Sequence, residues 1–290
     1  MIDKKKILFV VNPISGIKGK EAAIQLLEKA LAKNISYKIV YTERTGHATE
    51  LTKNAAEEGY HAVIAVGGDG TVNEVAKALI HSEVALGVIP FGSGNGFARH
   101  LGIPLQVKAA IQCINKFNIA TIDTASLNKE PFIATAGMGF DAHIASQFAN
   151  YGKRGFLSYS QIALNEFLTY KSKKYSLKVD GIKIKKHAFL ICFANVGQYG
   201  NNAWIAPTAE ASDGKLKVCI LEPFPAHLAP DILLKLFNKT LHKSKYYEVI
   251  EAERITIKRP NIYQIDGEAR EKLNRRMKIK VVPHSLKVIC

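Results

Sequence analysis

Cysteine and tryptophan are scarce in this chain of 290 residues, which contains 4 Cys and 1 Trp. The cysteines lie far apart, form no CxxC pair and have no close histidine partner; they are Cys113, Cys192, Cys219 and Cys290. This spacing gives no support to a zinc cluster or to the disulfide framework of a small secreted protein. We therefore expect reduced, buried thiols.

Long apolar runs are also missing. The runs 62–66, 84–89 and 188–194 are much shorter than the roughly 18 consecutive apolar residues that cross a bilayer. Near the N-terminus, the apolar segment 7–11 is too short for the core of a signal peptide, and no cleavage site accompanies it. We therefore expect a cytoplasmic protein whose contact with a membrane is peripheral.

Acidic residues are outnumbered, because 25 Asp and Glu stand against 40 Lys and Arg and leave a formal net charge of +15. A basic chain favours anionic partners such as nucleotides, nucleic acid or acidic lipid surfaces. Apolar residues, by contrast, are plentiful at 47%. That fraction is ample for a buried core, which argues against disorder and favours one large domain or two of ordinary size.

The first 120 residues or so alternate short strand-like runs with helical stretches. The segments are 7–11, 21–32, 37–41, 49–58, 62–66, 72–80 and 86–89. This alternation is typical of βαβ units and a parallel sheet. Because 7–11 and 62–66 are apolar throughout, their strands should be covered by helices on both faces. The sequence therefore predicts a doubly wound α/β fold in this half.

After Phe117 the pattern changes to strand-like pieces separated by turn signals, which predicts a mostly β second half. The segments 175–179 and 182–186 flank Asp180-Gly181, as in a hairpin with a type I′ turn. Helical stretches are expected at about 157–171 and 229–241.

Three glycine-rich loops each follow a predicted strand of the first half: 12–16, 67–71 and 92–96. In a parallel sheet they would emerge at the carboxyl edge, where ligands bind. Glycine lets the backbone approach a phosphate closely, and a helix N-terminus adds unpaired N–H groups. Each loop alone is equally compatible with an ordinary turn. Gly67-Gly68-Asp69-Gly70-Thr71 matches neither the Walker nor the Rossmann pattern, which argues against a P-loop NTPase and a dehydrogenase.

Taken together, the motifs resemble the diacylglycerol-kinase catalytic domain family, which includes sphingosine, ceramide and bacterial diacylglycerol kinases. In chain order they are Asn12-Pro13-x-x-Gly16, Thr42-x-x-x-Gly46-His47-Ala48, Gly67-Gly68-Asp69-Gly70-Thr71-Val72-Asn73-Glu74, Pro90-Phe91-Gly92-Ser93-Gly94-Asn95, Asp213-Gly214-x-Leu216-x-Val218 and Asp266-Gly267-Glu268. GGDGT alone is shared with NAD kinases and phosphofructokinase-like proteins, whereas the combined set is specific. One departure is Gly96, where many bacterial members carry Asp.

The resemblance implies two domains with ATP and Mg²⁺ in a cleft between them. Residues 1–122 with 284–290 would form the nucleotide-binding α/β domain, and residues 123–283 a mostly antiparallel β-sandwich that takes the lipid. The positions that match nucleotide-binding residues are Asn12, Pro13, Ile14, Ser15, Gly16, Thr42, Gly67, Gly68, Asp69, Gly70, Thr71, Val72, Asn73, Ser93 and Glu268.

The resemblance also implies roles for three carboxylates. Asp266 matches the proton acceptor, Asp69 would hold the water network of Mg²⁺, and Asp213 with the carbonyls of Leu216 and Val218 matches a metal site. Without the resemblance, Asp266-Gly267 and Asp213-Gly214 are first of all turn signals. Phosphoryl transfer needs mainly positioning and charge stabilisation, which these parts can supply.

We therefore expect an ATP- and Mg²⁺-dependent kinase of a membrane lipid hydroxyl, such as that of diacylglycerol or a sphingoid lipid, acting in phospholipid metabolism. The alternatives are an NAD kinase-like enzyme for a soluble alcohol and a non-catalytic nucleotide- or polyanion-binding protein. Basic residues gather at 171–186, 235–245 and 270–280, which suits an anionic membrane surface. No nucleic-acid-binding motif accompanies them, so we expect no nucleic acid partner. The acceptor lipid, the regulation and the oligomeric state, with a dimer among the options, stay open.

Overall fold

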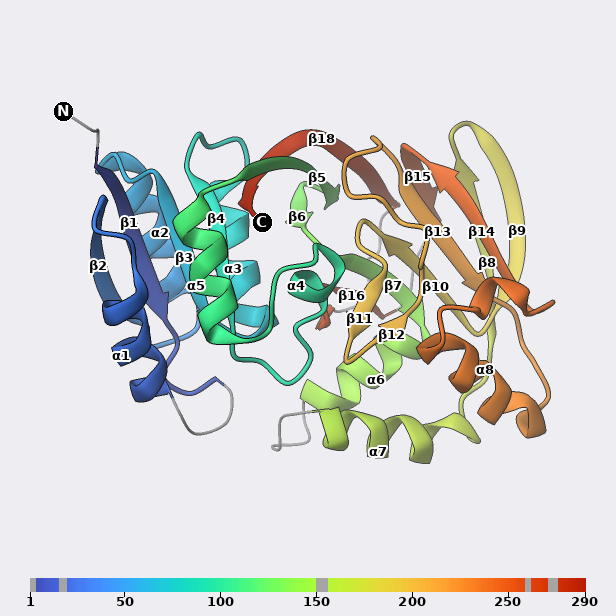
Figure 1. The fold of residues 1–290 in the computed structure, drawn as a ribbon. Helices are drawn as coiled ribbons and strands as arrows, with labels where there is room; N and C mark the ends of the chain where they lie inside the picture. The colour runs from blue at the N-terminus through green and yellow to red at the C-terminus, as the bar shows by residue number, and fades with distance from the viewer. Residues whose placement is uncertain (1–3, 16–19, 150–155, 259–261, 271–275) are drawn as a thin grey trace. The chain divides into compact units, whose positions relative to one another are not determined.

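The computed structural model describes residues 4–15, 20–149, 156–258, 262–270 and 276–290 (Figure 1). The chain divides into two compact units, residues 1–122 with 284–290 and residues 123–283. Each unit has a sheet-based core of its own. Within the described residues, none of the helices is both long and apolar enough to span a bilayer.

The first unit is built on a parallel sheet with the strand order β2-β1-β3-β4. Its strands are β1 Lys5–Val11, β2 Ile35–Tyr41, β3 Ala62–Gly67 and β4 Ala85–Pro90. Next to β4 lies the end of β18 Met277–Ile289, where Val288 pairs in parallel with Leu86. The connecting helices are α1 Lys20–Ala30, α2 His47–Glu57, α3 Asp69–Leu79, α4 Gly96–His100 and α5 Val107–Lys116.

Helices cover both faces of this sheet. On one face, α1 and α5 pack Leu27 and Ile111 against Phe9 and Ile64. On the other face, α2 and α3 bury their own apolar stripes, which include Val75 on α3 (Figure 1). The prediction of a doubly wound sheet is thereby confirmed, and the reason is the one expected: strands with two buried faces need apolar residues at every position.

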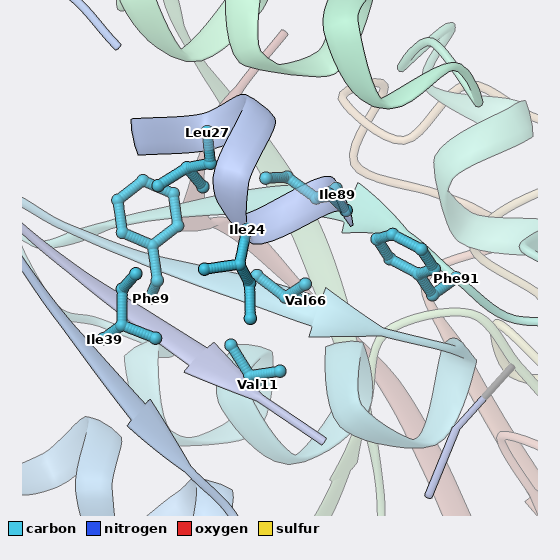
Figure 2. Close-up of a pocket in the computed structure, with 9 residues that line it drawn as sticks. Phe9, Val11, Ile24, Leu27, Ile39, Val66, Ile89 and Phe91 are labelled. Atoms are coloured by element: carbon cyan, nitrogen blue, oxygen red, sulfur yellow. The ribbon is translucent and has the colours of Figure 1, made fainter. Parts of the chain in front are cut away.

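Figure 2 shows a small cavity between α1 and the sheet, lined by apolar side chains that include Phe9, Ile24 and Phe91. Its volume is about 10 Å³, which is about the space that a single water molecule needs. It is therefore a packing gap and has no room for a nucleotide.

The second unit contains two layers of antiparallel strands. One layer is formed by β5 Ile119–Leu127, β6 Glu130–Phe132, β8 Lys173–Val179, β9 Ile182–Ala188, β15 Arg254–Ile257 and the first part of β18. The other has the order β14-β13-β10-β7-β16-β17, with β14 Tyr247–Ala252, β13 Leu216–Leu221, β10 Leu190–Ala194, β7 Thr135–Gly139, β16 Tyr263–Ile265 and β17 Glu268–Arg270. A short ribbon joins β11 Gln198–Gly200 to β12 Ala203–Trp204.

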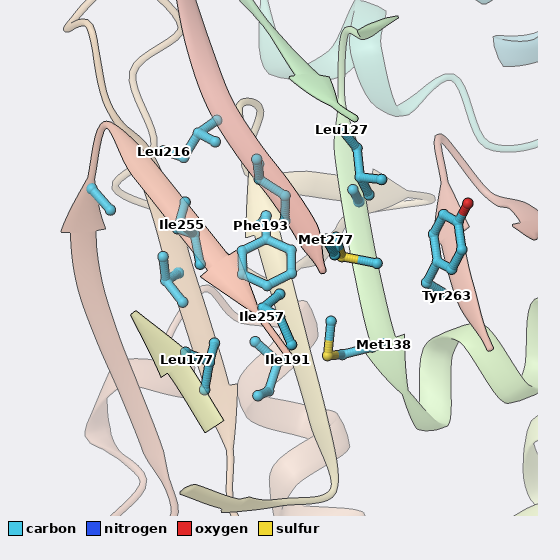
Figure 3. Close-up of a cluster of buried hydrophobic side chains, with 14 of the residues drawn as sticks. Leu127, Met138, Leu177, Ile191, Phe193, Leu216, Ile255, Ile257, Tyr263 and Met277 are labelled. Atoms are coloured by element: carbon cyan, nitrogen blue, oxygen red, sulfur yellow. The ribbon is translucent and has the colours of Figure 1, made fainter. Parts of the chain in front are cut away.

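The two layers form a sandwich, since one apolar core takes side chains from both (Figure 3). Leu177, Ile255 and Met277 come from the first layer, and Met138 and Phe193 from the second. Strand residues alternate between this core and the outer faces. The outer face of the second layer carries a further apolar cluster, against which α8 Ala229–Phe237 packs Ile232. The antiparallel β-sandwich implied by the resemblance is confirmed.

The helices of the second unit differ from the sequence prediction. α7 runs Phe156–Phe167 and α8 stops at Phe237, so both are shorter than expected at their C-terminal ends. After α8, Lys239 takes a left-handed backbone with φ 59°, which ends the helix. The structure adds α6 Phe140–Ala149 and two 3₁₀ turns, Ala226–Leu228 and Leu241–Lys243.

Two smaller predictions have mixed outcomes. The hairpin around Asp180-Gly181 forms as expected, with φ values of 42° and 93° that suit a type I′ turn. Of the cysteines, Cys192 and Cys219 are buried, whereas Cys113 is half-buried and Cys290 is exposed. The expectation of four buried thiols is thus wrong for these last two.

Candidate active site

The loop after β1 is organised by the side chain of Asn12. Its Oδ1 accepts the backbone N–H of Ile14 at 3.0 Å and that of Ser15 at 3.3 Å. Its Nδ2 donates to Oγ1 of Thr71 at 3.1 Å. Asn12 therefore shapes its own loop and ties it to the loop after β3. Pro13 lies on the exposed side of this turn, and Gly16 lies outside the described residues.

The loops after β3 and β4 pack backbone against backbone. A Cβ added to Gly92 would lie 2.7 Å from the Cα of Gly68, and one added to Gly68 would lie 3.0 Å from the Cα of Gly92. A Cβ on Gly67 would lie 2.5 Å from Oγ1 of Thr71. Real Cβ atoms do not approach other atoms as closely as at Gly92 and Gly67, so a larger residue there would force its neighbours to move, whereas at Gly68 the contact would be tight.

Helix α3 begins directly at this contact. Its N-cap residue is Gly68. Because glycine has no side chain, this residue makes no capping hydrogen bond to the first N–H groups of the helix. Asp69, Gly70 and Asn73 lie in the first turns and are at least partly accessible, while Val72 is buried in the core at 3% exposure. Any contact of Val72 with a ligand would therefore involve its backbone alone.

Helix α2 is fixed to α3 by Glu74. Its carboxylate accepts the N–H of Gly46 at 2.9 Å and that of Ala48 at 3.2 Å. Gly46 has a φ of 83°, a backbone conformation that glycine adopts without strain. Thr42 lies just before this loop, where its N–H donates to the carbonyl of Val11 at 2.9 Å. Sequence reasoning quoted Glu74 as part of a motif and missed its role as the cap of α2.

The loop after β4 is closed by Asn95, which is 9% exposed and has a φ of 49°. Its Oδ1 accepts the N–H of Gly92 at 2.9 Å and its Nδ2 donates to the carbonyl of Gly92 at 2.8 Å. Ser93 is exposed at the tip of this closed turn. The structure thus brings three of the predicted loops together at the carboxyl edge of the first sheet, through Asn12–Thr71 and Gly68–Gly92.

In the second unit, Asp266 occupies the turn between β16 and β17. Asp266 and Gly267 have φ values of 48° and 83°, so the turn signal was interpreted correctly. The carboxylate accepts three backbone N–H groups, from Ile133 at 3.2 Å, Ala134 at 2.8 Å and Thr135 at 3.1 Å. These three bonds hold the half-buried carboxylate in one orientation at the start of β7.

Glu268, two residues further on, is an exposed carboxylate on β17. It pairs with Nη2 of Arg270 at 3.1 Å, and Arg270 also binds Glu130 at 2.6 Å. Hydrogen bonding to Glu130, with help from Glu268, raises the pKa of Arg270. The nucleotide contact predicted for Glu268 stays a prediction.

Asp213 belongs to an ion-pair cluster. Its Oδ1 accepts the N–H of Lys215 at 2.9 Å, and its Oδ2 accepts Nζ of Lys217 at 3.0 Å. The ammonium of Lys217 also binds Glu251 at 2.6 Å. Hydrogen bonding to Lys217, and then to Lys215, lowers the pKa of Glu251 to about 2.

This cluster bears on the metal site expected at Asp213, Leu216 and Val218. A side-chain ammonium already pairs with Asp213. In strand β13, Val218 has ladder partners on both sides and Leu216 has one, in β14. Within the part of the chain that is described, no group of three His, Cys, Asp or Glu could hold a metal ion. The residues around Asp213 do not fit a divalent cation, so we assign no step to a metal there.

Sequence reasoning missed two buried carboxylates. Asp123 on β5 is fully buried, and its Oδ2 accepts the N–H of Gly214 at 2.7 Å. Asp141 on α6 is 7% exposed, and burial raises its pKa to about 7. The only sequence signal for either would have been a lone acid within an apolar segment.

The second unit also contains a pocket of about 190 Å³ that is lined largely by aromatic side chains. Four aromatic side chains line it. Phe167 and Tyr170 lie at and just after the end of α7, Phe189 lies between β9 and β10, and Phe224 precedes the 3₁₀ turn 226–228. Leu168, at its rim, is 78% exposed.

Two family models together match most of the chain. The model described as diacylglycerol kinase catalytic domain matches residues 6–127. The model described as YegS C-terminal NAD kinase beta sandwich-like domain matches residues 134–290. The chain belongs to the YegS-like family of lipid kinases. The resemblance predicted from the motifs is therefore confirmed.

Relatives of similar length support this assignment. The Probable lipid kinase YegS-like protein of Yersinia enterocolitica is 30% identical over 281 residues, which are 93% of this chain and 94% of that protein. The protein of the same description from Yersinia pestis is 29% identical over 288 residues, with 93% and 94% covered. A solved structure of a diacylglycerol kinase from Bacillus anthracis has a TM-score of 0.76 at 21% identity and covers 99% of this YegS-like chain and 96% of its own. That likeness shows the fold alone.

Proposed function

We propose that this YegS-like protein transfers the γ-phosphate of ATP to a hydroxyl group of a membrane lipid, such as diacylglycerol or a sphingoid lipid. The observation that carries the proposal is the meeting of glycine loops at the start of α3. The Gly68–Gly92 contact leaves no side chain between the two backbones, and the adjoining helix N-terminus favours negative charge. Such a site suits a polyphosphate.

Mg²⁺ would accompany the nucleotide in this proposal. Magnesium takes oxygen ligands, keeps several waters and needs only one or two carboxylates. The first unit offers the carboxylate of Asp69 in the first turn of α3, and the hydroxyls of Ser15 and Thr71 beside Gly67, so its oxygen donors fit that ion. Magnesium would neutralise charge on the phosphates, while Asn12 and the glycine loops orient them.

Asp266 is the proposed acceptor of the hydroxyl proton. The three amides of residues 133–135 fix its orientation, and a fixed carboxylate can align the attacking hydroxyl without reorganisation. Its position in a tight turn is compatible with this role, since the turn leaves Asp266 partly accessible.

The exposed leucines around the aromatic-lined pocket support a lipid acceptor rather than a soluble alcohol. Exposed leucines lie on both helices near it: Leu164 and Leu168 at the end of α7 are 75% and 78% exposed, and Leu233 and Leu234 on α8 are 54% and 62% exposed. Clusters of exposed apolar side chains indicate an interaction surface. Lys239, Lys243 and Lys245, just after α8, are exposed as well. We propose that α7 and α8 contact an anionic membrane.

A second group of basic residues lies on the opposite side of the sandwich. The register of β9, β8, β15 and β18 places seven cations on the outer face of the first layer, with no acid at the outward positions of these described strands: Lys174, Lys178, Lys183, Lys185, Arg254, Lys278 and Lys280. Helices α7 and α8 pack on the second layer. The two basic groups therefore cannot lie against one membrane plane at the same time.

The catalytic proposal is tested by incubating the protein with labelled ATP, Mg²⁺ and extracted membrane lipids, and identifying the labelled product by mass. Label in a phospholipid product is the expected result. ATP consumption only with a soluble alcohol would favour an NAD kinase-like activity, and ATP binding without turnover of any acceptor would favour a binding protein. As a control, Asp266→Asn should lower kcat by about 10²–10⁴-fold, with little change in ATP affinity.

The membrane proposal is tested by sedimentation with vesicles of phosphatidylcholine containing phosphatidylserine. Reversing two charges beside α8, with Lys243→Glu and Lys245→Glu, should weaken binding, because each near-surface cation contributes about 1 kcal/mol. The matched control is Lys178→Glu with Lys183→Glu, which makes the same charge change on the opposite face. Equal losses for both pairs would contradict docking through α7 and α8.

A further inference from the structure

A buried carboxylate lies directly behind the turn that carries Asp266. Asp141, in the first turn of α6, is 7% exposed and packs over Gly137 of β7. A Cβ on Gly137 would lie 2.1 Å from Oδ2 of Asp141 and 3.1 Å from Nε2 of Gln264. The missing side chain at Gly137 therefore creates the space in which the Asp141 carboxylate and the Gln264 amide meet.

Gln264 joins this carboxylate to the turn. It is 3% exposed, and its Nε2 lies 3.3 Å from Oδ2 of Asp141. Its Oε1 accepts the backbone N–H of Gly267 at 2.8 Å. Tyr199 and the N–H of Ala142 also donate to Asp141, at 3.5 Å and 2.7 Å. An unbroken chain of hydrogen-bonding groups thus runs from Asp141 through Gln264 to the residue after Asp266.

The direction of the Gln264 amide depends on Asp141. An amide presents a donor at one end and an acceptor at the other. Because ionised Asp141 only accepts, it draws Nε2 toward Oδ2 and leaves Oε1 to face the N–H of Gly267; the protonated acid does the same when its proton lies on the other oxygen. If the amide were reversed, its NH₂ would face the N–H of Gly267, and the turn would lose this bond. Asp266 holds a left-handed backbone in that turn, with φ 48°, which Asp adopts more readily than most residues other than glycine.

We propose that Asp141, acting through Gln264, is a positioning residue that holds the turn in which Asp266 accepts the proton. This inference rests on the proposed lipid kinase activity. Asp141 has no part in the bonds that form or break; it sets where the Asp266 carboxylate lies. Carboxylates that orient a catalytic group through an intermediate side chain commonly change activity by about 10–100-fold when they are replaced.

Other titratable groups of the described residues surround Asp141, and the two acids among them, Glu166 and Glu268, are paired with other residues. The thiol of Cys192 on β10 and the phenols of Tyr170 and Tyr175 interact with its charge, and Tyr199 donates to it from β11. On its own helix, His143 pairs with Glu166 of α7 at 2.7 Å. On β17, which packs against α6, Glu268 and Arg270 pair with each other.

The test exchanges the polarity of the two partners. In Asp141→Asn, the new NH₂ group competes with Nε2 of Gln264, so the amide of Gln264 should reverse and release Gly267. In the double variant Asp141→Asn with Gln264→Glu, the Asn donates to one Glu oxygen and the other accepts from Gly267. We expect the single variant to lower kcat by about 10–100-fold with unchanged KM for ATP, and the double variant to recover most of that loss.

A second readout follows the hydrogen bond itself. Amide hydrogen exchange at Gly267, measured by NMR, should be protected in the wild type, exposed in Asp141→Asn and protected again in the double variant. Tyr199→Phe, which removes a donor to Asp141 and leaves Gln264 in place, is the matched control and should keep both kcat and protection. Gln264→Met removes the acceptor for Gly267 without changing Asp141, and should lower kcat as Asp141→Asn does.

The outcomes separate this inference from the proposed function. If the wild type labels a lipid and Asp141→Asn keeps its kcat within twofold, the positioning role is refuted. The positioning role of Asp141 is also refuted if the double variant folds but recovers neither the kcat of the wild type nor the exchange protection of the Gly267 amide. If the wild type labels no lipid, the proposed function fails, whereas exchange at Gly267 still decides whether Asp141 fixes the turn.

Discussion

Asp141 makes the stability of the protein depend on pH in a direction opposite to that of most acids. Burial raises its pKa from 3.8 to about 7, so between these values the folded state holds a proton that the unfolded state has lost. Stability must then fall as pH rises through this window, and level off above about pH 7. A difference of about three pKa units corresponds to about 4 kcal/mol, and partial relaxation of the site would reduce this value.

The assay compares the wild type with Asp141→Asn in urea at pH 4.5 to 8.5. Other groups that titrate in both proteins cancel in the difference between their free energies of unfolding. At pH 4.5 that difference already contains about 1 kcal/mol from Asp141, because this pH lies above the unfolded-state pKa of 3.8, in addition to the altered hydrogen bonds of the amide. Toward pH 8 the free energy of unfolding of the variant should rise relative to that of the wild type by up to about 4 kcal/mol, because the side chain of the variant has no charge to bury. A difference that stays constant within about 0.5 kcal/mol from pH 5 to 8 would refute the reasoning.

Three further predictions concern other parts of the molecule. Gly68→Val places side-chain atoms where Gly92 lies and should lower ATP affinity at least about tenfold by calorimetry in a protein that stays folded; a change of about 1.4 kcal/mol suffices for this. Lys217→Met removes the ammonium between Asp213 and Glu251 and should lower the free energy of unfolding in urea by about 1–3 kcal/mol. Addition of EDTA or Mg²⁺ to the wild type without nucleotide should leave its thermal midpoint unchanged, since Lys217 supplies the positive charge at Asp213.

The first sheet was predictable because its signal is local. Strands covered on both faces are apolar at each position, and 7–11 and 62–66 show this without any knowledge of their neighbours. The Asp180-Gly181 and Asp266-Gly267 turns were predictable for the same reason, since positive φ favours these residue types. Helix α6 was missed because it follows β7 directly at Gly139, with no loop to separate a strand pattern from a helix pattern.

The glycine-rich loops of the candidate site were predictable from the sequence, but their contacts were not, and the roles of single residues stay predictions. Glycine-rich loops identify where a backbone must come close, yet the partner of Gly68 is Gly92, which lies one strand further along the chain. The capping of α2 by Glu74 depends likewise on tertiary packing. Lys217 is the clearest example. Its ammonium reaches both Asp213 and Glu251 only because the register of β13 and β14 brings Glu251 opposite Lys217, and no local pattern reveals such a register.

The two interpretations of Asp266, turn residue and proton acceptor, do not compete once the geometry is considered. A carboxylate on a flexible loop would lose orientational freedom each time it bound a hydroxyl, and that cost would appear in the barrier. Here the turn fixes the backbone of Asp266 at φ 48°, and the amides of 133–135 fix its carboxylate. The Gln264 bond to Gly267 then fixes the turn from behind. The same residue types that make Asp-Gly a good turn thus supply a pre-oriented carboxylate, and the test of that orientation lies in Asp141, which is buried behind the turn.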